Sequence, residues 1–250
     1  MTETSPATAP PTRRRTPWRA AFFVLAGLGI VAGVAWALLG SRLFVVRSVT
    51  VAGTHLVTPA QVIAAADVPA GTSLIGLDAG QVARRVETIR QVASATVAKD
   101  WPDHLVITVR ERVPVVAVRM TGGGFDLVDP TGVIVRWSPT EPAGLPLYLT
   151  SLTGGALRGN PGLATAAAVL GELSPALSAQ VASVGVTQAL SGSGVTAGEA
   201  YQVLLGLRDH KSVLWGGTDD AAQKNRELAV LMRGSATYFD VSAPGTVVTK

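Results

Sequence analysis

The strongest pattern of apolar positions is an uninterrupted run over residues 20–41, which contains no charged side chain. At a rise of about 1.5 Å per residue this run forms a helix of roughly 33 Å, enough to cross a hydrocarbon core of about 30 Å. An α-helix also satisfies its own backbone hydrogen bonds, which lipid cannot do. The run therefore predicts a single transmembrane helix over 20–41. The roughly 200 residues that follow are enough to bury a sizeable core.

The segment that follows the apolar run alternates between strand and helix signals. A Val-rich stretch over 43–53 ends at a glycine, which predicts a strand. Thr58 and Asp78 each precede a helical pattern with Gln three residues later, which predicts two capped helices. Alternating apolar and polar positions predict two more strands, at 92–99 and 105–111. The predicted order is β-α-α-β-β.

The remaining residues, 114–250, contain mostly short strand patterns between turn signals. Two helical patterns interrupt them, at 161–173 and from Thr218 to about Met232. Thr218 is expected to cap the second helix, with Asp219 and Asp220 in its first turn. The strands are expected at 115–119, 125–128, 133–137, 147–149, 181–187, 201–207, 212–215 and 237–241. Tight hairpins favour a largely antiparallel sheet, so the body as a whole is predicted to be α+β, with a mixed α/β domain at its C-terminal end.

The positive charge of the chain is concentrated in residues 1–19, which carry three of its four net positive charges. The arginines concerned are Arg13, Arg14, Arg15 and Arg19. Because Lys and Arg stay on the cytoplasmic side of a first crossing, we expect a cytoplasmic N-terminus and an extracytoplasmic body. The body is nearly neutral and therefore lacks the basic face that nucleic-acid binding needs. The composition of residues 1–19 predicts a disordered tail.

A cleaved signal peptide is the alternative to an uncleaved anchor. Ala35-Trp36-Ala37 resembles a cleavage site, but it lies inside an apolar run that is longer than the roughly 7–15 residues of a signal peptide. An anchor is therefore favoured. Gly29 and Gly33 form a G-x-x-x-G pattern that can pack against another membrane helix, so a role beyond tethering stays open.

Catalytic and metal-binding patterns are missing from the sequence. There is no cysteine, which excludes disulfides and thiolate chemistry. His55, His104 and His210 stand at expected turns without a second ligand nearby. No serine-hydrolase elbow, P-loop or S-x-x-K motif occurs, and turn chemistry explains Asp126 and Asp129. We therefore expect no enzyme activity, cofactor or metal; a membrane-anchored envelope enzyme with an unrecognised site is the alternative.

Several short motifs follow one another in a fixed order behind the apolar run. They are Val49-x-Val51-x-Gly53, Gly71-x-x-Leu74-x-x-Leu77-Asp78, Trp101-Pro102, Glu111-Arg112 with Pro114, Lys224-x-x-x-Leu228-x-x-Leu231 and Tyr238-x-Asp240-Val241. Together they make the chain resemble the FtsQ/DivIB family of bacterial cell-division proteins. The resemblance implies a POTRA domain over 43–113 and an FtsQ-type β domain over 114–250. The excess of Arg over Lys, 17 to 4, is typical of a GC-rich genome such as that of an actinobacterium.

The resemblance also implies a function. It predicts a bitopic, single-pass scaffold in the cell membrane at the division septum, which binds FtsB (DivIC) and FtsL. Such a scaffold helps to recruit and regulate septal peptidoglycan synthesis by FtsW/FtsI, and FtsK is a further candidate partner for the POTRA domain. A POTRA-type assembly factor of an outer membrane is disfavoured, because only one POTRA-like unit is present and no barrel pattern follows.

The family resemblance places the partner-binding site at the terminal strand and the helix before it. A terminal strand can accept another strand along its edge. The expected binding residues are Thr237, Tyr238, Phe239, Asp240, Val241, Lys224, Leu228 and Leu231. Replacing Asp240 by Lys or Phe239 by Arg is expected to weaken FtsB binding and to leave the body folded.

Overall fold

The computed structural model of the chain describes residues 18–40, 44–188, 201–243, 245 and 248–249. Helix α1 (Trp18–Gly40) coincides with the apolar run over 20–41, so the helical part of that prediction is confirmed. Judged on length and apolarity together, none of the helices in the described part of the chain meets the requirement for a membrane span. Arg13, Arg14 and Arg15 lie outside the described residues, whereas Arg19 falls within α1.

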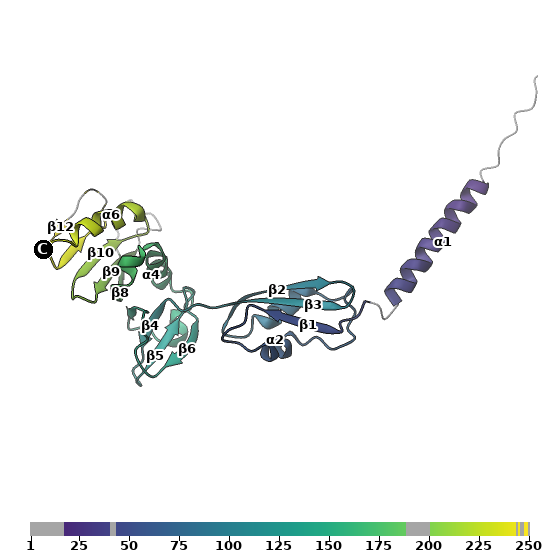
Figure 1. Cartoon of the computed structure of the whole chain (residues 1–250), viewed down its shortest axis with the longest axis horizontal. Helices are drawn as coiled ribbons and strands as arrows, with labels where there is room; N and C mark the ends of the chain where they lie inside the picture. Colours follow the sequence, from purple (N-terminus) through teal and green to yellow (C-terminus); the bar gives the residue numbers. More distant parts are fainter. Residues whose placement is uncertain (1–17, 41–43, 189–200, 244, 246–247, 250) are drawn as a thin grey trace, which may run out of the picture.

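A small three-stranded unit follows α1 (Figure 1). Its elements are β1 (Ser48–Ala52), α2 (Pro59–Ala66), α3 (Ala79–Val86), β2 (Val92–Asp100) and β3 (His104–Glu111), which confirms the predicted β-α-α-β-β order. The sheet order is β1-β3-β2, with β1 parallel and β2 antiparallel to the central strand. β1 is shorter than the predicted strand over 43–53, because Val45 pairs only as an isolated bridge with Ser73.

Local capping sets the two helices of this unit as predicted. The Thr58 hydroxyl accepts from the Gln61 N–H while the Gln61 side chain accepts from the Thr58 N–H, which is a complete capping box. Asp78 accepts from the Gln81 N–H at the start of α3. The apolar faces of both helices then pack on the sheet around the buried Val62, Val82 and Ile107.

Among the described residues the second unit is built on nine strands, in the order β12-β11-β10-β9-β8-β7-β4-β5-β6. They are β4 (Val116–Arg119), β5 (Phe125–Val128), β6 (Ile134–Ser138), β7 (Leu147–Leu149), β8 (Val181–Gln188), β9 (Tyr201–Leu207), β10 (Ser212–Gly216), β11 (Tyr238–Asp240) and β12 (Val248–Thr249). Five of the eight pairings are antiparallel, which agrees with the predicted largely antiparallel sheet.

Helices cover the core of this sheet. The principal ones are α4 (Pro161–Glu172) and α6 (Ala221–Leu231), and two short ones are η1 (Gly154–Leu157) and α5 (Pro175–Ser178). Leu163 and Val169 of α4 and Leu228 of α6 are buried in one apolar cluster with inward-facing residues of β8 to β11. The helix at α6 does not begin as predicted. Its N-cap is Asp220, in a left-handed conformation without a side-chain capping bond, so the expected Thr218 cap is wrong.

Candidate partner-binding site

The C-terminal end of the sheet differs from the prediction in one respect. β11 pairs in parallel with β10 on one side, and on its other side β12 pairs Thr249 with Phe239 and Val248 with Asp240. The predicted free edge at 237–241 is therefore occupied by the chain itself. Asp240 explains the reversal, because its Oδ1 accepts from the N–H and the hydroxyl of Ser242 at 3.0 and 2.7 Å and turns the chain back. Within the described residues the sheet ends at β12.

The eight predicted binding residues divide by their burial. Four of them have side chains enclosed in the domain, namely Lys224, Leu228, Phe239 and Val241. Thr237 is exposed and Tyr238, Asp240 and Leu231 are half-buried. A partner can therefore reach only the second group without unfolding the domain, and their binding role stays a prediction.

Lys224 is completely buried, which is unusual for a lysine. Its Nζ donates to the Gly217 carbonyl at 3.1 Å and lies 5.8 Å from the centre of the Trp215 ring. Burial lowers the pKa of Lys224, and the negative charges of Asp219, Asp220 and Glu172 oppose that shift. The side chain thus connects the start of α6 to the loop after β10, a structural role that its sequence motif does not reveal.

The outer surface of α6 carries an apolar hollow that the sequence motifs miss. It measures about 370 Å³ and is lined by Arg226, Glu227, Val230 and Leu231. Val230 keeps 65% of its surface exposed, and Val248 on β12 is also exposed. The Gly245 N–H donates to Glu227 Oε1 at 3.3 Å, which ties the β11–β12 connection to this helix. Glu227 therefore both lines the hollow and holds the chain segment that leads into β12. The only signal for this hollow in the sequence is that Val230, an apolar residue, lies outside the buried stripe of α6.

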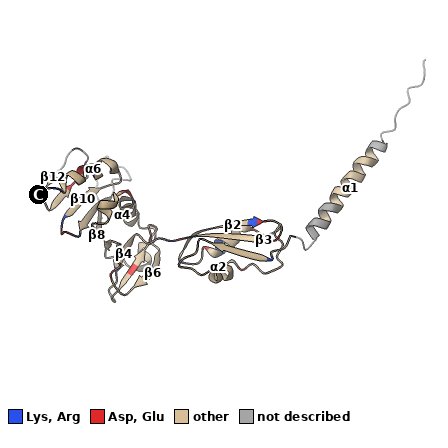
Figure 2. Cartoon of the chain, viewed as in Figure 1, with Lys and Arg blue, Asp and Glu red and all other residues tan. Residues whose placement is uncertain are grey.

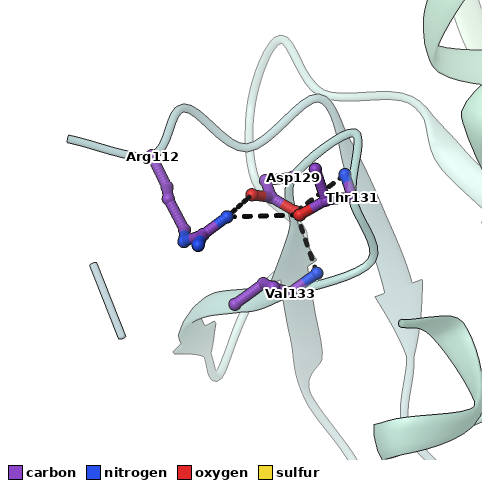
Figure 3. A network of polar contacts seen from close by, with 4 residues as sticks. All are labelled: Arg112, Asp129, Thr131 and Val133. Atoms are coloured by element: carbon purple, nitrogen blue, oxygen red, sulfur yellow. Dashed lines mark hydrogen bonds and ion pairs between the residues drawn. The ribbon is translucent and has the colours of Figure 1, made fainter. Parts of the chain in front are cut away.

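A second polar site lies where the two units meet, at Glu111 and Arg112; Figure 3 shows Arg112 with Asp129, Thr131 and Val133. The Glu111 carboxylate accepts backbone N–H groups of His55, Leu56 and Val57, each at about 2.8 Å, and so holds the loop before α2. The next residue, Arg112, faces the other unit. It donates from NH1 to Asp129 Oδ2 at 2.6 Å.

Asp129 is the centre of this joint. Its Oδ1 accepts the N–H groups of Thr131 and Val133 at 2.9 and 2.8 Å, and the Thr131 hydroxyl at 2.8 Å, while Oδ2 receives Arg112. Burial acts to raise the pKa of Asp129, but the hydrogen bonds from Arg112, Val133 and Thr131 outweigh it and lower the pKa below its usual value. The carboxylate therefore stays charged and links both units.

The remaining candidate groups of the sequence are dispersed. Burial raises the pKa of Asp126, and the positive charge of Arg90 partly opposes that shift. His104 contacts Ser48 and Asp103, whereas His55 donates its backbone N–H to Glu111. Among the residues that the structure describes, no three His, Asp or Glu side chains are grouped as metal ligands. Figure 2 shows acidic and basic residues interspersed over the described body rather than gathered in one stripe.

Comparison with known proteins shows which protein family the chain resembles. Residues 44–112 match the family model of the POTRA domain, FtsQ-type. The chain is 35% identical over 233 residues to the cell division protein FtsQ of Streptomyces venezuelae, covering 90% of this chain and 82% of that protein. It is 34% identical to FtsQ of Streptomyces collinus, covering 90% and 85%.

The mycobacterial relatives are similar but longer. FtsQ of Mycobacterium leprae is 36% identical over 241 residues, which cover 94% of this chain and 63% of that protein. The chain therefore spans less than two thirds of this relative. Taken with the Streptomyces matches, these similarities show that the chain belongs to the FtsQ family of bacterial cell-division proteins.

Proposed function

We propose that this protein is a non-catalytic scaffold of the division machinery, which binds FtsB and FtsL and thereby helps to recruit and regulate septal peptidoglycan synthesis by FtsW/FtsI. The observation that carries the proposal is the surface at the C-terminal end of the sheet. There β12 forms the outer edge of the sheet, and Gly245 before it is hydrogen-bonded to Glu227 of α6, which lines the same hollow as the exposed Val230. The FtsQ family membership supports the cell-division role.

The proposed binding mode is strand addition. An extended segment of FtsB pairs with β12, whose other side is already bonded to β11. Main-chain hydrogen bonds supply a sequence-independent part of the affinity, and side chains of the added strand supply specificity. The hollow on α6 accepts an apolar side chain against Val230 and Leu231, while Arg226 and Glu227 at its rim select the charge pattern of the partner.

Replacing Val230 by Asp is expected to weaken the capture of FtsB at least about tenfold, because a buried apolar anchor is a typical interface hot spot. The folded domain should be unaffected, since Val230 is 65% exposed. The measurement is titration of the full-length protein in detergent with the extracytoplasmic segment of FtsB. Ile63→Asp is the matched control, because Ile63 is an exposed apolar residue on a helix of the POTRA unit. Equal affinities of the two variants would place the FtsB surface elsewhere.

We also propose that α1 anchors the protein in the cell membrane with a cytoplasmic N-terminus. This rests on the uncharged run over 20–41 and on the arginines before it. After protease treatment of spheroplasts, an epitope at the N-terminus is expected to survive and one at the C-terminus to be lost. Release of the intact chain by alkaline carbonate would instead argue for a peripheral attachment.

FtsK remains a proposed partner of the POTRA unit. Within the described residues, β1 pairs on one side only, with β3. Leu56, in the loop before α2, and Ile63, on α2 itself, are exposed apolar residues of the same unit. These features support an extended or helical segment of FtsK as the occupant of the β1 side of the unit.

A further inference from the structure

A polar cleft of about 410 Å³ lies at the C-terminal ends of β7 and β8. These two strands are parallel and are connected through α4. In such crossovers the carboxyl ends of the strands and the start of the helix form a natural ligand site. The cleft is lined by Tyr148, Leu149, Thr150, Ser151, Leu152, Asn160, Gly162, Val186, Gln188 and Tyr201.

The N-terminus of α4 opens into this cleft. Asn160 caps the helix, since its Oδ1 accepts the Leu163 N–H at 2.9 Å and its carbonyl accepts the Ala164 N–H. Pro161 has no N–H group. Gly162 is therefore the first-turn donor that no described residue satisfies. An unsatisfied N–H at the positive end of a twelve-residue helix favours an anion.

The side chain of Tyr148 provides an independent indication of a ligand. Tyr148 is only 7% exposed, and none of the described residues forms a hydrogen bond with its hydroxyl. That hydroxyl is directed at the start of α4, because a Cβ atom built on Gly162 would lie 3.5 Å from it. The ring is enclosed while the hydroxyl borders the cleft, so this unpartnered group can donate to an acceptor that enters from there.

The protonation of Tyr148 fits the same role. Burial, and to a smaller extent the neighbouring Tyr201, raise the pKa of Tyr148 above its usual value. The hydroxyl therefore remains a donor at all physiological pH values. Tyr201 also lines the cleft, so a second phenol is available on the opposite strand.

We propose that this cleft binds a carboxylate at the C-terminal end of a short peptide, with the Tyr148 hydroxyl and the Gly162 N–H as its donors. All the lining side chains are uncharged, so the site suits a single negative charge better than a phosphate dianion. The volume lies in the range of small-molecule sites and accommodates one or two terminal residues. The Ser151 hydroxyl and the Gln188 amide are available to the peptide backbone.

The test is ligand-observed saturation-transfer NMR with the full-length protein in detergent. The probe is acetyl-alanyl-alanine, and its C-terminal amide is the matched control. We expect the acid to bind at least about tenfold more tightly than the amide, because hydrogen bonds to a charged acceptor are the stronger ones. Equal binding of acid and amide, or no binding of either, would overturn the proposal.

Two variants locate the binding. Tyr148→Phe removes only the hydroxyl and is expected to weaken binding of the acid about tenfold while leaving the melting temperature unchanged or higher. Tyr201→Phe is expected to cause a smaller loss. Thr96→Val, on β2, removes an exposed hydroxyl from the other unit; it is the control and should bind as the parent chain does. A fall in melting temperature for Tyr148→Phe without a change in acid binding would show that the hydroxyl is structural, and would refute the site.

Discussion

Phe239→Ala is expected to lower the free energy of unfolding of the β domain by about 3–5 kcal/mol, the usual cost of truncating a buried phenylalanine. Phe239 has no exposed surface and packs in the same cluster as Val213, its cross-strand neighbour on β10. Because the cluster is continuous, surrounding side chains cannot close the cavity fully. Urea titration followed by tryptophan fluorescence measures the effect, since Trp215 belongs to that cluster.

Tyr238→Ala is the control for this prediction. Tyr238 precedes Phe239 on β11 but points to the opposite face, where it is half-buried. Its removal should cost less than about half as much, in proportion to the smaller apolar area lost. Similar losses for the two variants would mean that β11 does not have the register observed here.

The burial of Phe239 also corrects a sequence-based expectation. Phe239→Arg places an unpaired charge inside the apolar cluster, which costs several kcal/mol. The expectation that this variant leaves the body folded is therefore wrong. A loss of FtsB binding in Phe239→Arg would report unfolding rather than a contact, whereas a substitution of the exposed Val230 tests the surface itself.

The elements of the POTRA unit were predictable because their signals are local. Thr58 and Gln61 form a capping box from residues three positions apart, and alternation in β3 places Leu105, Ile107 and Val109 in the core. These patterns depend only on helix and strand periods. These elements can therefore be predicted from neighbouring residues alone, without knowledge of which distant segments they contact.

The features that were not predicted depend on pairing between distant segments. β12 consists of Val248 and Thr249 alone, too short for any period, and it becomes a strand only because Asp240 and Gly245 reverse the chain. Lys224 is buried because the Gly217 carbonyl and nearby carboxylates compensate its charge. For this reason the candidate partner surface lies one strand further out than the sequence predicted, at β12 and Val230 rather than at β11.

The domain joint combines both kinds of feature. Asp129-Pro130-Thr131-Gly132 is a turn signal that sequence reading finds, and Asp129 does accept the N–H groups of its own turn. Its bond to Arg112 appears only in the folded chain. Glu111 and Arg112 are consecutive, so their side chains leave the backbone on opposite sides at the end of β3. One dipeptide thus holds the POTRA loop and the β domain together.

Asp129→Ala is expected to destabilise the protein by about 3 kcal/mol at pH 7, because it leaves the largely buried Arg112 without its charge partner. Two further N–H groups, of Thr131 and Val133, also lose their acceptor. Glu141→Ala is the matched control. Glu141 forms an exposed pair with Arg119 at 3.8 Å, and its loss should cost less than about 1 kcal/mol.

The dependence on pH separates the charge of Asp129 from its packing. The pKa of Asp129 is lower in the folded chain than in the unfolded chain, where it is about 3.9. The charged carboxylate therefore makes its full contribution to the free energy of unfolding at pH values above that unfolded pKa. This contribution declines as the pH falls from that value towards the lowered folded pKa, where the carboxylate takes up a proton in both states. The difference between the parent chain and Asp129→Asn in urea titrations should therefore be larger at pH 7 than at pH 3. A difference that stays constant over this range would mean that the charge of Asp129 does not hold the joint, and that shape alone does.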